Sequence, residues 1–390
     1  MSEPAGLARI PLLGYGFRPF FLGAALWAIT AMGVWIAALT GSVERLERFG
    51  ALSWHVHEFL FGYVAAVIAG FLLTAVPSWT GRPPVRGGLL LSLVATWLAG
   101  RLALLSGEAL GPLQAAAIDS LFLVLLAGVV AREILAAGNR RNLKVALLVS
   151  ALALANMLFH AEIIATGAAD LALRGGIALV LGLIMLIGGR IVPAFTRNWL
   201  VARRAASLPA PLDGLDAAAL AVAAAALAAW VAYPDALLTG LALCAAGLLQ
   251  GVRLSRWRGQ DTWREPLLLV LHLGYAFVPL GFLLVGAGQL TGAVLPTAAL
   301  HAWTAGAMGV MTLAVMTRAS LGHCGRALTA SIPTRGIFAA IIIAALLRVL
   351  ASLAPAAGSL LVELSAVAWL AAFAGFVVAY GPMLLRRRAA

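Results

Sequence analysis

Residues 54–76 read WHVHEFLFGYVAAVIAGFLLTAV, an almost uninterrupted apolar run that opens with two histidines. A run of about 20 apolar residues is long enough to cross the hydrocarbon core of a bilayer as an α-helix. Similar runs recur along the whole chain of 390 residues, of which 63% are hydrophobic and 11% are charged. Soluble domains carry about 25% charged residues. The sequence therefore predicts an integral membrane protein.

Gly, Pro and Arg residues separate the apolar runs and divide the chain into twelve predicted spans. We expect an all-α, polytopic membrane bundle of about 12 transmembrane helices that forms one integral membrane domain over residues 1–390. A short N-terminal arm (1–18) and a basic C-terminal tail (386–390) lie at its ends. The predicted spans cover residues 20–39, 54–76, 88–105, 113–131, 143–166, 173–192, 217–233, 236–251, 266–285, 295–315, 337–354 and 360–385.

Basic residues gather in every second loop. Arg140, Arg141 and Lys144 follow the fourth span, whereas residues 106–112 after the third span contain no Lys or Arg. Cytoplasmic loops carry the excess of Lys and Arg in membrane proteins, so both termini are predicted to be cytoplasmic. The net charge of +12 then reflects topology and attraction to anionic lipid. The bilayer is the expected partner, and nucleic acid is not.

Three similar motifs end the second, sixth and tenth predicted spans. They read AVPSWTGR (75–82), IVPAFTR (191–197) and LAVMTR (313–318), and their threonines lie four spans apart each time. Three four-helix repeats would produce this spacing. Chance similarity between short segments of biased composition is the alternative explanation.

Four of the six histidines fall at one depth of the predicted bundle, near its outer face: His55, His57, His160 and His301. Polar side chains inside a membrane are costly, and imidazole is a common ligand of iron and copper. Residues two apart on a helix point about 200° away from each other, so one metal cannot easily take both His55 and His57. Hydrogen bonds between helices are the simpler alternative for each histidine.

The helix face below His55 consists of small residues (Gly62, Ala66, Ala69 and Gly70). Small residues let a flat porphyrin or another helix come close to the backbone. We therefore predict a haem whose axial ligands are His55 and His301. Because the chain contains no CxxCH motif for covalent attachment, this haem would be b-type. His57 and His160 remain for copper, for an exchangeable metal position or, in the case of His57, for a hydrogen bond.

Charged residues complete the predicted site. Glu58 and Glu162 lie in the outer half and are predicted to carry protons. The arginines of the three span-end motifs, Arg82, Arg197 and Arg318, are candidates for binding haem propionates or lipid phosphates. Interfacial anchoring is their alternative role. Their predicted cytoplasmic position separates them from a haem at the outer face.

Six motifs stand out as specific: GFRPFF (16–21), WHVHE (54–58), GFLLTAVP (70–77), WTGRP (79–83), GRIVPAFTRN (189–198) and MTRASLGH (316–323). Together they resemble the NnrS family of polytopic bacterial membrane proteins, over nearly the whole chain. This resemblance implies haem and copper as cofactors, nitric oxide as the ligand, a role in denitrification and nitrosative stress, and location in the bacterial inner membrane.

Twelve spans in units of four also resemble the catalytic subunit of haem–copper oxidases and nitric oxide reductases, whose helices 2 and 10 supply haem ligands. His55 or His57 and His301 stand on the corresponding spans here. Spans 6 and 7 contain no histidine. The three-histidine copper site of those enzymes therefore cannot form in the same place, and His160 on span 5 would have to contribute.

These patterns favour an oxidoreductase that reduces nitric oxide (2 NO to N2O) at a haem and a second metal, with electrons from a quinol or a cytochrome. Two other functions stay open. One is a non-enzymatic protein that binds or senses nitric oxide or handles metal. The other is a secondary transporter, which twelve spans and an internal repeat would suit.

Overall fold

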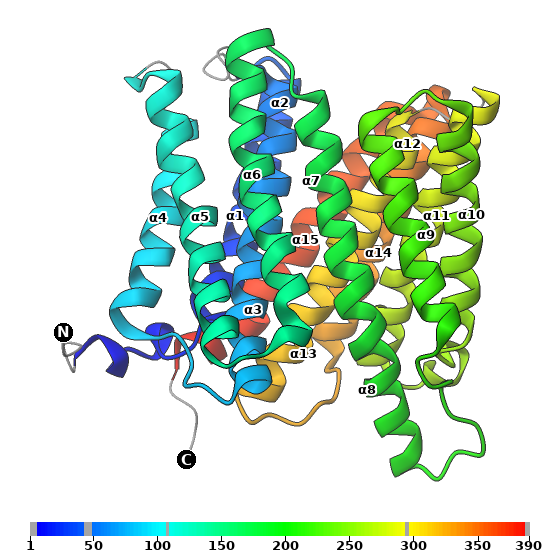
Figure 1. Ribbon diagram of the computed structural model, residues 1–390. Helices are drawn as coiled ribbons and strands as arrows, with labels where there is room; N and C mark the ends of the chain where they lie inside the picture. The colour runs from blue at the N-terminus through cyan, green and yellow to red at the C-terminus, as the bar shows by residue number, and fades with distance from the viewer. Residues whose placement is uncertain (1–5, 43–48, 107–108, 293–295, 387–390) are drawn as a thin grey trace. The chain divides into compact units, whose positions relative to one another are not determined.

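The computed structural model describes residues 6–42, 49–106, 109–292 and 296–386. Within these ranges the chain is helical and contains no strand. Twelve helical spans among them are long and apolar enough to cross a membrane, which confirms the predicted fold class (Figure 1). Nine of the spans are single α-helices: α1 (Phe17–Leu39), α4 (Gly87–Leu105), α5 (Pro112–Ala136), α6 (Leu143–Thr166), α9 (Gly214–Ala232), α10 (Leu237–Ser255), α11 (Pro266–Thr291), α14 (Ile332–Leu353) and α15 (Gly358–Leu385).

Each of the other three spans contains a π-helical segment. The second span consists of α2 (Ala51–His57), η3 (Glu58–Val64) and α3 (Ala65–Thr80). The sixth consists of α7 (Asp170–Leu183), η6 (Ile184–Gly188) and α8 (Gly189–Ala202), and the tenth of α12 (Pro296–His301), η8 (Ala302–Val310) and α13 (Met311–His323). These are the three spans that carry the related motifs. Since π segments are rare and frequently mark functional sites, their recurrence supports an internal repeat.

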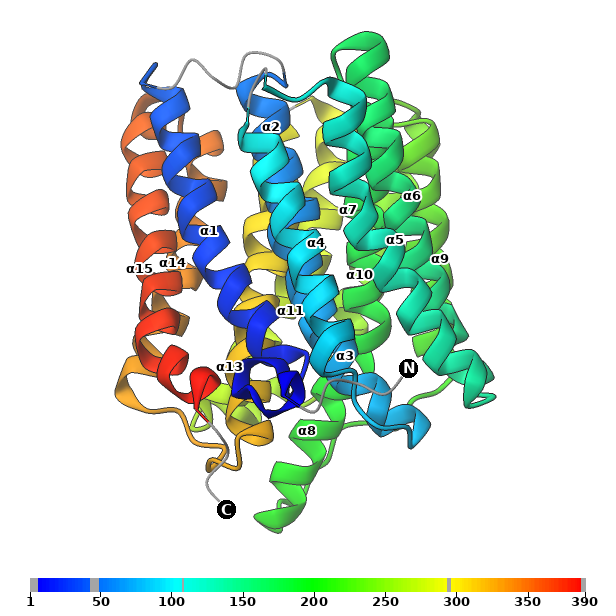
Figure 2. The ribbon, with the colours of Figure 1, turned by 90° about the vertical axis from the view of Figure 1, so that its left-hand side faces the viewer.

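The chain divides into two compact units. Unit 1 contains residues 1–176, 316–327 and 373–390, and unit 2 contains residues 177–315 and 328–372. Within unit 1, α5 packs between α4 and α6, and α1 packs on α3 (Figure 2). Within unit 2, α10 packs against both α9 and α11.

Several helices extend beyond the predicted spans. The sixth span was predicted to end at Val192, yet α8 continues to Ala202. Its last two turns contain Thr196 and Arg197, which interrupt the apolar run without breaking the helix. Hydropathy locates the apolar part of a helix and not the polar turns that continue it.

Arg18 is buried at the start of unit 1. Its side chain is 7% exposed and lies in the first turn of α1. Nη1 donates to the carbonyl oxygen of Leu384 at 2.8 Å and to that of Met383 at 3.3 Å. The last carbonyls of a helix have no partner within the helix. Arg18 therefore caps α15 and ties the start of unit 1 to its end.

Candidate metal centre

Six polar side chains meet inside unit 1, where α2, α4, α5 and α6 lie together. His57 ends α2 and Glu58 begins the π segment η3, and both are completely buried. The other four side chains are also at least 97% buried, and they are Arg101 of α4, Asp119 of α5, and Asn156 and His160 of α6. We call these six residues the histidine–aspartate cluster.

Asp119 is the centre of the cluster. Its Oδ2 accepts hydrogen bonds from Asn156 Nδ2 and His160 Nε2, both at 2.9 Å, and lies 3.2 Å from His57 Nε2. Its Oδ1 is paired with Arg101 Nη2. One carboxylate thus joins side chains from three other helical elements.

His57 has an acceptor at each ring nitrogen. Nδ1 lies 3.1 Å from Glu58 Oε1, and Nε2 lies 2.9 Å from Asn156 Oδ1 as well as facing Asp119. Because carboxylate and amide oxygens accept, both nitrogens carry a proton in this arrangement and the imidazole is positively charged. Arg101 and His57 then balance Glu58 and Asp119, so the buried charges sum to zero, as a low-dielectric site requires.

A metal ion fits this arrangement of donors. One ligand atom from each of His57, Asp119 and His160 lies within 4.8 Å of the other two. Ligand atoms about 2.0 Å from a tetrahedral metal lie roughly 3.3 Å apart, close to the 2.9 and 3.2 Å between Asp119 Oδ2 and the two imidazole nitrogens. A cation there would replace the shared protons. Two imidazoles and one carboxylate suit copper and are also a ligand set of non-haem iron(II).

Gly62 makes room for the cluster. A Cβ atom at this position would lie 2.5 Å from Arg101 Nη1 and 2.8 Å from Glu58 Oε2. The Gly62 carbonyl, in the π segment, accepts a hydrogen bond of 3.0 Å from Trp97 Nε1 of α4. The small residues below His55 were predicted to admit a porphyrin or a helix. Arg101 fills the space at Gly62, and Phe21 of α1 fills it at Gly70.

His55 points away from the cluster. Its half-buried ring stacks on Trp35 of α1 with 4.3 Å between the ring centroids and contacts Phe59 at 4.7 Å. His55 and His57 thus face different helices, as helical geometry requires.

His301 belongs to unit 2, where it ends α12. Its Nδ1 lies 2.6 Å from the Thr297 carbonyl oxygen, so Nδ1 carries the proton and Nε2 keeps its lone pair. Histidines that bind metals commonly donate their other ring nitrogen to such a carbonyl. His301 therefore fits an axial haem ligand. Its pairing with His55 of unit 1 stays a prediction.

The remaining predicted site residues do not join the cluster. Glu162 Oε2 accepts from the Ala172 backbone at 3.1 Å and caps the first turn of α7. Arg197 is exposed and Arg318 is half-buried. Arg82 Nε pairs with Glu133 of α5 at 2.5 Å. Their roles as proton carrier and propionate ligands stay predictions.

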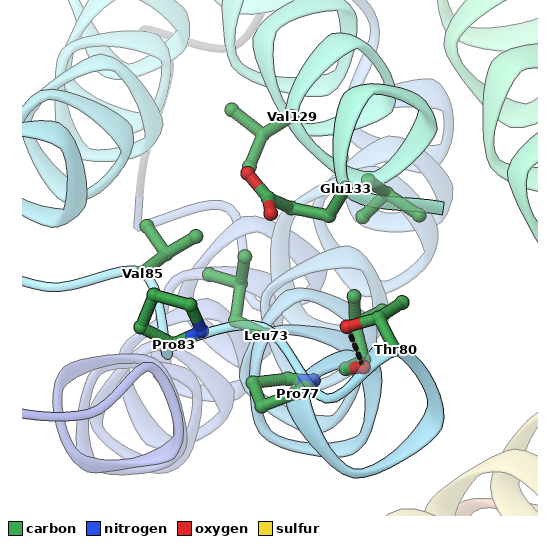
Figure 3. A pocket seen from close by; sticks show the side chains of 9 residues that line it. Leu73, Pro77, Thr80, Pro83, Val85, Val129 and Glu133 are labelled. Carbon is green, nitrogen blue, oxygen red and sulfur yellow. Dashed lines mark hydrogen bonds between the residues drawn. The ribbon is translucent and has the colours of Figure 1, made fainter. Parts of the chain in front are cut away.

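Glu133 lines a small pocket at the far end of α3, with room for about one water molecule (Figure 3). Leu73, Pro77 and Thr80 of α3 form one side of it, and Val129 of α5 lies beside Glu133 (Figure 3). Thr80 is 23 residues from His57, on the order of 30 Å along the helix. This pocket is therefore separate from the cluster.

The other two histidines are also outside it. His272 of α11 lies 2.9 Å from the Thr196 hydroxyl through Nε2. His323, at the end of α13, stacks on Tyr15 with 5.7 Å between the ring centroids. Burial raises the pKa of the Tyr15 phenol.

Sequence reasoning missed the role of Arg101, which lies inside the third predicted span. A signal was available. Arg101 lies four residues before the end of α4 and Asp119 seven residues after the start of α5. A short connection makes two such helices antiparallel neighbours, and opposite charges at matching depth inside a membrane are expected to pair.

A family model described as NnrS protein matches residues 11–388, nearly the whole chain. A search of curated proteins found no match.

Proposed function

The chain belongs to the NnrS family, and on that premise we propose that it is a metal-dependent membrane protein that reduces nitric oxide to nitrous oxide. The observation that carries this proposal is the buried set of His57, Asp119 and His160 with Glu58 beside it. A ligand set and an acidic group buried together in a membrane span are what a metal-centred proton-coupled reaction needs. The metal is copper or iron(II), and a b-type haem is the second cofactor.

The reaction consumes two NO, two electrons and two protons and yields N2O and water. When bound, the metal would supply electron transfer to nitric oxide, with a quinol or a cytochrome as the electron source. The protein supplies position and protons. His57, His160 and Asp119 would hold the metal, Asn156 orients Asp119 through its Nδ2, and Glu58 Oε1 accepts the hydrogen bond from the proton on His57 Nδ1.

Two buried donors next to the cluster have no partner within the described residues. They are Trp27 Nε1 and Arg101 Nε, and the two side chains meet at Gly62. Buried donors without partners are commonly satisfied by a small polar molecule.

The test compares metal content and nitric oxide consumption in the purified full chain. We expect stoichiometric copper or iron, consumption of added nitric oxide with a chemical reductant, and nitrous oxide in the headspace. His160→Ala should lose the metal and the activity, whereas His323→Ala, outside the cluster, should retain both. Metal at wild-type stoichiometry in His160→Ala would refute this site.

One observation favours a second candidate function. Asp119 is held by His57, Arg101, Asn156 and His160, a closed arrangement that suits metal storage or nitric oxide sensing more than turnover. In the same experiment this candidate predicts bound metal and a spectral change with nitric oxide, but no nitrous oxide.

A further inference from the structure

The second and tenth spans share a local construction that extends to their histidines. His57 and His301 each stand immediately before a π segment, η3 in one span and η8 in the other. A glycine follows five residues later in both, Gly62 and Gly306. Each glycine is closely covered by a neighbouring side chain. By local structure, His301 is the counterpart of His57.

The next span contributes an arginine in both places. Arg101 lies four residues before the end of α4, and Arg348 lies five residues before the end of α14. Arg101 pairs with the carboxylates of Glu58 and Asp119. No carboxylate of the described residues forms an ion pair with Arg348, whose only hydrogen bond there joins Nη1 to Ser352 Oγ at 3.2 Å. The two arginines therefore differ in their counter-charge.

His301 and Arg348 are linked through two hydroxyl side chains. Thr297 accepts from His301 Nδ1 with its carbonyl oxygen, and its hydroxyl donates to Ser352 Oγ at 3.2 Å. Ser352 Oγ also accepts from Arg348. This chain of contacts lies wholly within unit 2. It leaves the lone pair of His301 Nε2 and the remaining N–H groups of Arg348 for a ligand.

An arginine in a membrane span that has no carboxylate partner in the described part of the chain needs an anion. A guanidinium binds carboxylate and phosphate oxygens in a bidentate way, and a neutral imidazole nitrogen binds a metal. A single molecule that offers both partners is a metalloporphyrin with its carboxylate side chains. A lipid phosphate offers only the anion for the arginine and no metal for the imidazole.

We propose that His301, Arg348 and Ser352 form a haem site in which His301 ligates the iron and Arg348 binds a haem carboxylate. The site rests on the proposed function for its cofactor, but not on the histidine–aspartate cluster. It also replaces the span-end arginines, Arg82, Arg197 and Arg318, as the place where haem carboxylates bind.

The experiment titrates haemin into the purified full chain and follows the Soret band, with phosphorus analysis of the co-purified lipid. Arg348→Gln should weaken haem binding about tenfold or more, and Arg348→Lys should restore part of it because it keeps the charge. His301→Ala should remove the haem spectrum. Arg335→Gln on the same helix, whose side chain bonds to the Ala330 carbonyl, is the matched control and should bind haem normally.

Unchanged haem affinity in Arg348→Gln together with less bound phosphorus would overturn the proposal and assign Arg348 to a lipid phosphate. Failure of the proposed function looks different. In that case the wild-type chain binds haemin through His301 and Arg348 but contains no copper or iron at the cluster and consumes no nitric oxide. Haem binding that survives His301→Ala would also overturn the inference.

Discussion

The other polar side chains of the histidine–aspartate cluster surround the charged carboxylate of Asp119. It accepts from two histidines and an asparagine at one oxygen and pairs with Arg101 at the other. Removing one partner of a buried ion pair leaves the other charge uncompensated in a medium of low dielectric. The cost of such a change is therefore set by Arg101 and His57, and not by the carboxylate alone.

Asp119→Asn tests this dependence. The amide has nearly the shape of the carboxylate but leaves the cluster with one excess positive charge. We expect a loss of about 3–5 kcal/mol in the free energy of unfolding and loss of metal binding, measured by thermal denaturation in detergent and by metal analysis. Glu363→Gln, on an exposed position of α15, should change neither. Wild-type stability in Asp119→Asn would show that the cluster is not charge-balanced as described.

At this scale the sequence predicted which residue types matter but not their partners. His57 and His160 were grouped by depth, and the structure does bring them together around Asp119. His55 was predicted to be a haem ligand because the helix face below it consists of small residues. In the structure that face packs against Phe21 and Arg101. Hydropathy and periodicity give depth and face, whereas the neighbour across that face depends on packing that one sequence does not reveal.

The π segments set the geometry of the three long spans. A π turn widens the helix and frees a carbonyl from its usual partner. In η3 the freed carbonyl oxygen of Gly62 accepts a hydrogen bond from Trp97 Nε1. In η6 the carbonyl oxygen of Met185 accepts a hydrogen bond from Arg253 Nη1 at 3.2 Å. Arg253 is itself paired with Asp216 of α9 at 2.8 Å. A π segment beside a buried arginine thus occurs in each unit.

Gly62→Ala tests the contribution of η3. The added methyl would lie 2.5 Å from Arg101 Nη1, so either the arginine or the π segment must move. Forcing a methyl into a packed interior costs about 1–3 kcal/mol, and we expect weaker metal binding with it. Gly128→Ala is the control, because nothing lies within 4 Å of its Cβ position and alanine favours a helix. Equal behaviour of the two variants in thermal denaturation would contradict a tight role for Gly62.

The periodic pattern alone could not predict the π segments. Apolar residues recur in the π segments with much the same spacing as in an α-helix. The extra residue in each turn is stabilised by contacts with other helices. The sequence signal that did exist was the repetition of the span-end motifs. It selected the second, sixth and tenth spans, which are the ones that contain π segments.

For the molecule as a whole, the orientation in the membrane decides which compartment the cluster faces. The twelve spans are confirmed, while cytoplasmic termini remain a prediction from the distribution of Lys and Arg. The cluster lies at the end of α2, near the start of the second span, and near the end of α4. If the termini are cytoplasmic, that end of unit 1 faces outward, and nitric oxide and an electron donor would approach it from the outer side.

Labelling of single cysteines tests this orientation in the full chain. With Cys244 and Cys324 replaced by serine, Ala109→Cys places a thiol between α4 and α5, and Ser207→Cys places one after α8, both at exposed positions. A membrane-impermeant maleimide added to spheroplasts should label the thiol at position 109 and reach the one at 207 only after lysis. The reverse pattern would invert the topology. It would direct the histidine–aspartate cluster to the cytoplasm, where its protons and electrons would come from the cytoplasmic side.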